Sequence, residues 1–166
     1  MNLRQEILKE HSKAQCTRIV QWVGSNQQRF DELFRLFLHD EYQVVQRAAW
    51  PLSYCVIAHP SFISKHWKKL LGNLKKPNLH DAVKRNSIRL MQDVNIPEKY
   101  HGEVMHICFG YLESPTEPLA VKCFSMTLAP RATAATETSM PQVWSEYPTG
   151  TLNLLTIACM ANKLTS

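Results

Sequence analysis

The stretch Val45-Gln46-Arg47-Ala48-Ala49-Trp50-Pro51-Leu52 decides the fold, because related sequences occur twice more in the chain. The later copies occupy residues 83–90 and 121–128, so each copy begins 38 residues after the previous one. An equal offset, repeated twice, predicts an array of structural repeats. The columns agree in chemistry, with Val first, a small residue fifth, a large apolar residue sixth and Leu last. The small column is Ala49, Ser87 and Ser125, and the large column is Trp50, Ile88 and Met126.

The residues that precede each copy keep the same offset. Leu36, Leu74 and Leu112 are 38 residues apart, and apolar residues three positions earlier place a stripe on one helical face. Turn-forming sequences then separate each stripe from its copy of the repeated stretch. Each unit therefore reads as helix, short turn, helix, and neither helix buries its stripe alone. Stacking of such units forms the core of a solenoid, so we expect these three leucines to be buried in one row, with no β-sheet in residues 27–128.

A two-helix unit of this length, whose second helix opens with Val-x-Arg-x-x-small, resembles the HEAT/armadillo class of α-solenoids, in particular small stand-alone bacterial HEAT-repeat proteins. The resemblance covers about residues 27–128, and it is broken by Pro51 in the first copy and by Cys123 in the last. It implies an all-α fold of about three repeats, at 27–60, 61–95 and 96–128. It also implies a ladder between stacked units that contains Arg47 and Arg85, with Asp81 placed to pair with Arg85 at i, i+4.

The two ends of the chain depart from the register. Residues 1–26 are amphipathic but do not match the repeat, so we predict an N-terminal helical cap that completes a domain over residues 1–128. Pro115 at the start of a capping-box sequence is expected to open the last helix, and Pro130 to stop it. Residues 127–166 hold eight Thr and only four charged residues. We predict a tail of low order at 129–166, either a natural one or an out-of-frame reading, with weak helical character at 151–163.

Composition narrows the class of protein. The net charge is +5, no run of 18 apolar residues is present, and the first residues lack a signal-peptide core, so we predict a cytoplasmic protein that does not bind a membrane. The five cysteines are odd in number and widely spaced, which indicates buried free thiols and not disulfides or a metal site. No phosphate-binding loop, nucleophile elbow or HExxH sequence occurs. We therefore expect no enzyme activity, no metal and no cofactor.

A basic segment at residues 65–89 contains eight Lys and Arg residues but a single acid, Asp81. One hypothesis is a sequence-independent nucleic-acid surface, in which Lys and Arg side chains contact phosphates. The alternative is an ordinary solvated face whose Lys stems cover the edge of the core. The phosphate-binding candidates are Lys68, Lys69, Lys84 and Arg89.

The favoured interpretation is a non-enzymatic scaffold that binds another macromolecule, most plainly a protein, along the face of its second helices. Gln46, Lys84 and Lys122 are predicted to form one exposed column of that face. Nucleic-acid binding through residues 65–89 is the alternative. A minor alternative comes from DNA-repair glycosylases built on HEAT-like repeats, whose catalytic Asp lies among Trp residues. Asp81 with Trp50 and Trp67 has that composition, although no residue-by-residue match can be made.

Overall fold

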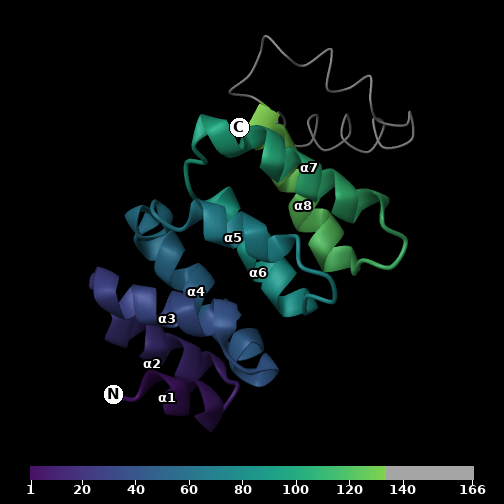
Figure 1. Cartoon of the computed structure of the whole chain (residues 1–166). Helices are drawn as coiled ribbons and strands as arrows, with labels where there is room; N and C mark the ends of the chain where they lie inside the picture. The colour runs from purple at the N-terminus through teal and green to yellow at the C-terminus, as the bar shows by residue number, and fades with distance from the viewer. Residues whose placement is uncertain (134–166) are drawn as a thin grey trace. The chain divides into compact units, whose positions relative to one another are not determined.

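The structure is a computed structural model of the whole chain, and it describes residues 1–133 (Figure 1). Every regular element in this range is a helix, so the predicted all-α class is confirmed and residues 27–128 contain no strand. Residues 134–166, including the predicted helix at 151–163, lie outside the described residues. The α-helices are α1 (Leu3–Lys9), α2 (Lys13–Val23), α3 (Gln27–His39), α4 (Tyr42–Ala58), α5 (Trp67–Leu74), α6 (Asp81–Gln92), α7 (His101–Glu113) and α8 (Leu119–Thr133).

The chain divides into two compact units, one comprising Met1–Asn95 and the other beginning at Ile96. The first unit contains α1 to α6, and α4 is its central helix, because α1, α2, α3 and α6 all pack against it. In the second unit α7 packs against α8. We propose, as the sequence suggested, that the pairs α3/α4, α5/α6 and α7/α8 represent successive repeats.

The starts of the N-terminal helices are set by side-chain caps. The side chains of Asn2, Ser12 and Asn26 each accept a hydrogen bond from the backbone N–H three residues later, at the starts of α1, α2 and α3. Such caps satisfy donors that have no partner inside the helix. Gly24 ends α2 with a φ of 51°, in the left-handed region that favours glycine.

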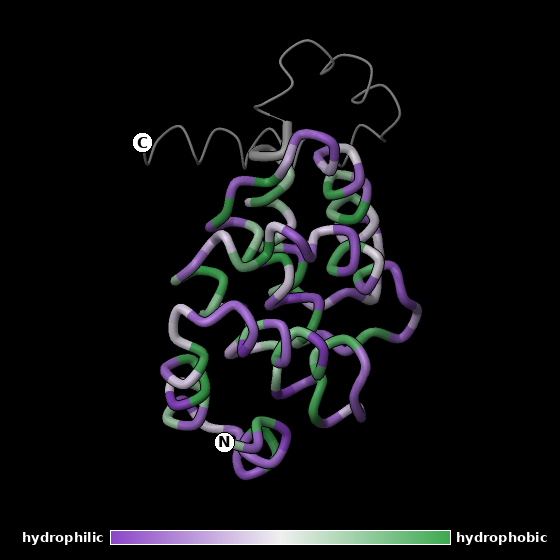
Figure 2. The backbone as a smooth tube through the Cα atoms, turned by 60° about the vertical axis from the view of Figure 1, so that its left-hand side comes forward, coloured by the Kyte–Doolittle hydropathy of each residue, from purple (hydrophilic) through white to green (hydrophobic). Residues whose placement is uncertain are grey.

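Apolar stripes account for the core of the first unit. Leu36 is 5% exposed and Leu74 4% exposed, whereas Leu112 in the second unit is half-buried. Hydrophobic and hydrophilic residues are interspersed along the helices of the tube (Figure 2). Pro51 lies inside α4, where it removes one backbone hydrogen bond. The largest fully buried side chains include Phe30, Phe34, Phe37, Phe109, Leu33, Leu52, Leu70 and Leu71.

The second repeat, predicted to begin at residue 61, does not open with one continuous helix. A 3-10 helix, η1 (Pro60–Ile63), comes first and α5 begins only at Trp67. The backbone N–H of His66 bonds to the carbonyl of Ile63 three residues earlier, which places the His66 side chain against α3. The residue that caps α6 is His80, whose side chain accepts a hydrogen bond from the Ala82 N–H.

The second unit also differs from the sequence-based predictions, at the start of α8 and at Pro130. The expected capping box at Ser114 does not form, since its hydroxyl lies 3.2 Å from that of Thr116 and α8 begins four residues beyond Pro115. Nor does Pro130 stop the helix, which continues to Thr133. A proline removes only one N–H donor from a helix, so the other backbone hydrogen bonds of α8 are sufficient for the helix to continue beyond Pro130.

The cysteines are free thiols in the described chain, but one of them is not buried. Cys16, Cys55 and Cys108 are buried, whereas Cys123 is exposed on α8. The prediction of buried thiols was therefore wrong for Cys123, because its column of the repeat faces away from the core. Cys159 lies outside the described residues.

Candidate functional site

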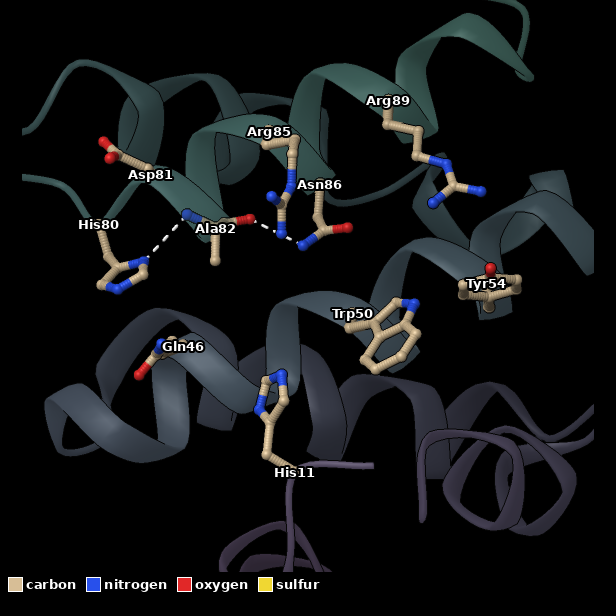
Figure 3. A pocket seen from close by; sticks show the side chains of 10 residues that line it. All are labelled: His11, Gln46, Trp50, Tyr54, His80, Asp81, Ala82, Arg85, Asn86 and Arg89. Carbon is tan, nitrogen blue, oxygen red and sulfur yellow. Dashed lines mark hydrogen bonds between the residues drawn. The ribbon is translucent and has the colours of Figure 1, made fainter. Parts of the chain in front are cut away.

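The main cavity of the first unit has a volume of about 440 Å³ and lies between α4 and α6, with one wall extended by the connection from α1 to α2 (Figure 3). We call it the α4–α6 cleft. Its lining is rich in aromatic, imidazole and guanidinium groups and contains one carboxylate. The lining residues are His11, Gln46, Trp50, Tyr54, His80, Asp81, Ala82, Arg85, Asn86 and Arg89.

The α4 wall of the cleft is formed by Gln46, Trp50 and Tyr54. These residues follow one another at intervals of four, so a single helical face presents all of them. The ring of His11 lies 5.8 Å from that of Trp50, with the two planes inclined at 32°. Trp50 is half-buried and Tyr54 is 37% exposed. This wall is therefore an accessible aromatic surface with an amide at one end.

The α6 wall presents two guanidinium groups one helical turn apart. Arg89 lies over the ring of Tyr54, with its Cζ 5.1 Å from the ring centroid, which is the geometry of a cation–π contact. Hydrogen bonding and charge from Arg89 lower the pKa of the Tyr54 phenol. Arg85 is exposed and forms no salt bridge with any residue in the range 1–133. Asp81 instead pairs with Lys84, at 3.9 Å between Oδ1 and Nζ.

Backbone hydrogen bonds hold the first turn of the α6 wall. The Nδ1 atom of His80 accepts from the Ala82 N–H at 2.9 Å, so this nitrogen carries no proton in that geometry. The Asn86 amide donates to the Ala82 carbonyl at 2.8 Å, and the ring of Tyr42 meets His80 edge-on at 5.1 Å. These contacts fix the α6 wall before any ligand binds.

A second cavity in the same unit, of about 410 Å³, is lined by residues of α3 and α5 and of the segment before α5. Asp31 accepts hydrogen bonds there from Lys65 at 2.6 Å, His66 at 2.8 Å and Gln27 at 2.9 Å. Burial raises the pKa of Asp31, but these donors lower it more, to about 2. His66 is 7% exposed and its ring stacks on Phe34 at 4.2 Å. We call this group the Asp31 network, and the three donors that converge on the Asp31 carboxylate indicate a structural role for it.

Comparison with known proteins decides the family. A family model described as a HEAT repeat domain matches residues 3–147. The chain belongs to the HEAT repeat family. The match begins well before residue 27, so the segment predicted as a cap falls within the family's domain. No curated protein and no solved structure matches the chain.

HEAT-repeat proteins are α-solenoids that generally act as scaffolds for protein–protein interaction, and the family is typically non-enzymatic. Within residues 1–133 of this HEAT-repeat protein, no three His, Cys, Asp or Glu side chains are grouped to hold a metal ion. No helix in that range combines the length and apolarity needed to cross a bilayer.

The α4–α6 cleft of the HEAT-repeat protein brings together five of the residues singled out in the sequence, Gln46, Trp50, Asp81, Arg85 and Arg89. Lys84 pairs with Asp81 of the cleft, and the column that it shares with Gln46 and Lys122 is half-buried at all three positions, not exposed as predicted. Lys122 lies on α8 in the other unit. The remaining two binding candidates, Lys68 and Lys69, are exposed on α5, and Lys69 lines the cavity of the Asp31 network.

The three ladder candidates have separate contacts. Arg47 donates through Nη1 to the carbonyl oxygen of Leu8 at 2.8 Å, and so contacts α1. Arg85 lines the cleft, and Asp81 pairs with Lys84 in place of Arg85. These contacts do not join the three residues into a ladder within residues 1–133, so the ladder between stacked units stays a prediction.

Sequence reasoning missed the aromatic and imidazole side of the cleft. Trp50 shares a column with Ile88, which is fully buried, so it was interpreted as core. The interval of four residues that joins Gln46, Trp50 and Tyr54 was a readable signal for a common face. His11 lines the cleft from the connection between α1 and α2, and no pattern in the sequence predicts that position. Trp67 is 2% exposed and does not line the cleft, so it does not join Asp81 and Trp50 in one site.

Proposed function

We propose that this HEAT-repeat protein is a non-enzymatic module that binds a protein partner through the α4–α6 cleft. The observation that carries the proposal is the meeting of Trp50 and Tyr54 with Arg85 and Arg89 across one cavity. Trp, Tyr and Arg are the residue types that most often dominate the binding energy of protein interfaces. The volume of about 440 Å³ also lies within the range of about 300–1,000 Å³ that is typical of ligand-binding pockets.

The composition of the cleft favours binding over catalysis. Its single carboxylate, Asp81, is exposed and lies within salt-bridge distance of Lys84. A general acid or base usually has a pKa shifted toward neutrality by burial or by a neighbouring charge. Trp67, the second Trp that a glycosylase-like arrangement would use, is buried in the core. The DNA-repair glycosylase alternative thus receives no support from the positions of these groups.

Site-specific photo-crosslinking tests the proposed function. A photo-reactive phenylalanine at Trp50 places the reactive group inside the cleft, and the same residue at Trp22 is a matched control, because Trp22 is also a half-buried indole but lies on α2. Irradiation of cells that express the protein is expected to give a discrete protein adduct from position 50 and none from position 22. Equal adducts at both positions, or adducts that disappear on nuclease treatment, would contradict a protein partner in the cleft.

A further inference from the structure

We propose that the α4–α6 cleft recognises an extended peptide with acidic side chains at alternate positions. The inference rests on the proposed function, since it assumes that the partner is a protein, and it specifies which segment of that partner enters the cleft. Three features of the first unit carry it: the charge of the lining, the spacing of two arginines and the width of the space between neighbouring helices.

The charge of the lining calls for an anionic ligand. Arg85 and Arg89 contribute two permanent positive charges, and the only carboxylate in the lining, Asp81, faces Lys84 at 3.9 Å. Arg85 forms no salt bridge within residues 1–133, so its guanidinium has its donors available. Carboxylates are the protein groups that a guanidinium binds most strongly, through two parallel hydrogen bonds.

The spacing of the arginines selects the pattern of acids. Arg85 and Arg89 are four residues apart on α6, which corresponds to about 6 Å along the helix axis. In an extended peptide, side chains on the same side are two residues apart and separated by about 6.6 Å. Adjacent acids in such a peptide point to opposite sides. An acid-x-acid sequence therefore presents one carboxylate to each guanidinium, and two consecutive acids do not.

The width of the cleft favours an extended chain over a helix. Axes of packed helices lie about 8–10 Å apart, and a helix with its side chains is about 10–12 Å wide. A ligand helix of that width would have to separate α4 from α6, whereas an extended backbone is thinner, since neighbouring strands of a sheet lie only about 4.8 Å apart. Trp50 and Tyr54 form the opposite wall, where they can cover the residue between the two acids, and Gln46 supplies an amide for the peptide backbone (Figure 3).

Arg89 is held in place for this role. Its guanidinium lies over the Tyr54 ring at 5.1 Å, which restricts its rotamers before the ligand arrives. Arg85 is the freer member of the pair and is exposed. We expect Arg89 to act as the fixed anchor and Arg85 to close on the second carboxylate.

Fluorescence anisotropy with the full chain tests the inference. The probes are labelled peptides that carry two Glu residues in an Ala/Gly/Ser background. The second Glu follows the first at position i+1, i+2, i+3 or i+4, and a further peptide has Gln in place of both Glu residues. Peptides with alternate acids are expected to bind at least about tenfold more tightly than isomers of equal charge with adjacent acids. The substitutions Arg85→Gln and Arg89→Gln are each expected to weaken that binding by about tenfold.

Matched variants separate recognition from general charge. Lys68→Gln removes one exposed positive charge outside the cleft and is expected to change the affinity less than about twofold. Arg89→Lys keeps the charge but loses the planar fork, so it is expected to fall between the wild type and Arg89→Gln. Circular dichroism melting curves identify any variant that fails to fold, and Arg85→Gln, at an exposed position, keeps the test valid if an Arg89 variant does not fold.

Several outcomes would overturn the inference. These are equal affinity for all acid spacings, equal losses in Lys68→Gln and Arg85→Gln, and tighter binding of duplex DNA that is abolished by the same Arg variants. The test remains distinct from that of the proposed function. If the crosslinked adduct at position 50 persists in the Arg85→Gln/Arg89→Gln double variant, protein binding stands and acid recognition fails. If no adduct forms at position 50 in the wild type, the proposed function itself fails.

Discussion

Arg47 of α4 donates a hydrogen bond from Nη1 to the carbonyl oxygen of Leu8, 2.8 Å away and 39 residues earlier in the chain. Leu8 is the penultimate residue of α1, so its carbonyl has no acceptor role inside that helix. We expect Arg47→Met, which keeps most of the aliphatic stem, to lower the free energy of unfolding by about 1–2 kcal/mol. Urea denaturation measures this change. Arg35→Met, at an exposed position on α3, is the control, and an equal loss in both variants would show that the bond to Leu8 contributes nothing.

Truncation of the three leucines that share the 38-residue spacing is expected to lower the free energy of unfolding by different amounts. Leu36 and Leu74 are nearly fully buried, so Leu36→Ala and Leu74→Ala are each expected to cost about 2–5 kcal/mol. Leu112 is half-buried and its truncation leaves a site that water can reach, so Leu112→Ala is expected to cost clearly less. Thermal and urea unfolding of the three variants checks the order. A loss at Leu112 equal to that at Leu74 would contradict the assignment of burial.

Features that depend on local pattern could be predicted from the sequence. The repeated stretch at residues 45–52 lies within one helix, α4, as the helix-turn-helix pattern predicted. The first repeat was predicted to begin at residue 27, and α3 does begin there, where the Asn26 side chain caps it. The small column of the repeat is buried at Ala49, Ser87 and Ser125, as close approach of helices requires.

Features that depend on contacts between distant segments could not be predicted. The interruption before α5 accompanies a bond from His66 to Asp31, 35 residues away, and nothing in the local sequence encodes that partner. The cleft likewise needs α4 to pack against α6 before Trp50 and Arg89 share a cavity. The basic segment was visible as composition, but its charges diverge in space, with Lys69 and Arg89 in different cavities.

The Asp31 network predicts a pH dependence of stability at acidic pH. The folded pKa of about 2 lies below the ordinary value of 3.8, so ionised Asp31 stabilises the fold above the unfolded pKa. That contribution is lost as the pH falls from about 4 through about 2. The Asp31→Asn variant lacks this contribution, so its free energy of unfolding is expected to approach that of the wild type as the pH falls over this interval. Lys65→Met should raise the pKa of Asp31, and a carboxyl titration by NMR near 3.8 in the wild type would contradict the network.

The thiols are expected to differ sharply in reactivity. Burial raises the pKa of Cys16 to about 11 and those of Cys55 and Cys108 to about 12, whereas Cys123 is exposed. Since the thiolate is the nucleophile, iodoacetamide at about pH 8 should modify Cys123 first and leave these three thiols intact in the folded chain. Peptide mass spectrometry reads each site, including Cys159, separately. Early alkylation of Cys108 would contradict its burial, and unfolding in urea should make all of these thiols reactive.

Binding to duplex DNA is expected to be weak and to depend less steeply on salt than the composition of residues 65–89 suggests. Four phosphate contacts, from Lys68, Lys69, Lys84 and Arg89, would give a log–log slope of about −3 to −4. In the structure Lys84 lies 3.9 Å from Asp81 and Arg89 lines the α4–α6 cleft, whereas Lys68 and Lys69 lie on a different helix, α5.

Exposed Lys68 and Lys69 on α5 are therefore the main phosphate contacts that we expect, and two contacts give a slope of about −2. Anisotropy of labelled duplex between about 50 and about 300 mM salt measures the slope, which should be the same for every DNA sequence. The double variant Lys68→Glu/Lys69→Glu is expected to abolish binding, and Lys84→Glu to leave the slope nearly unchanged. A slope near −4 that Lys84→Glu and Arg89→Glu both reduce would show that the whole basic segment forms one phosphate-binding surface, and nucleic acid would then replace protein as the proposed partner.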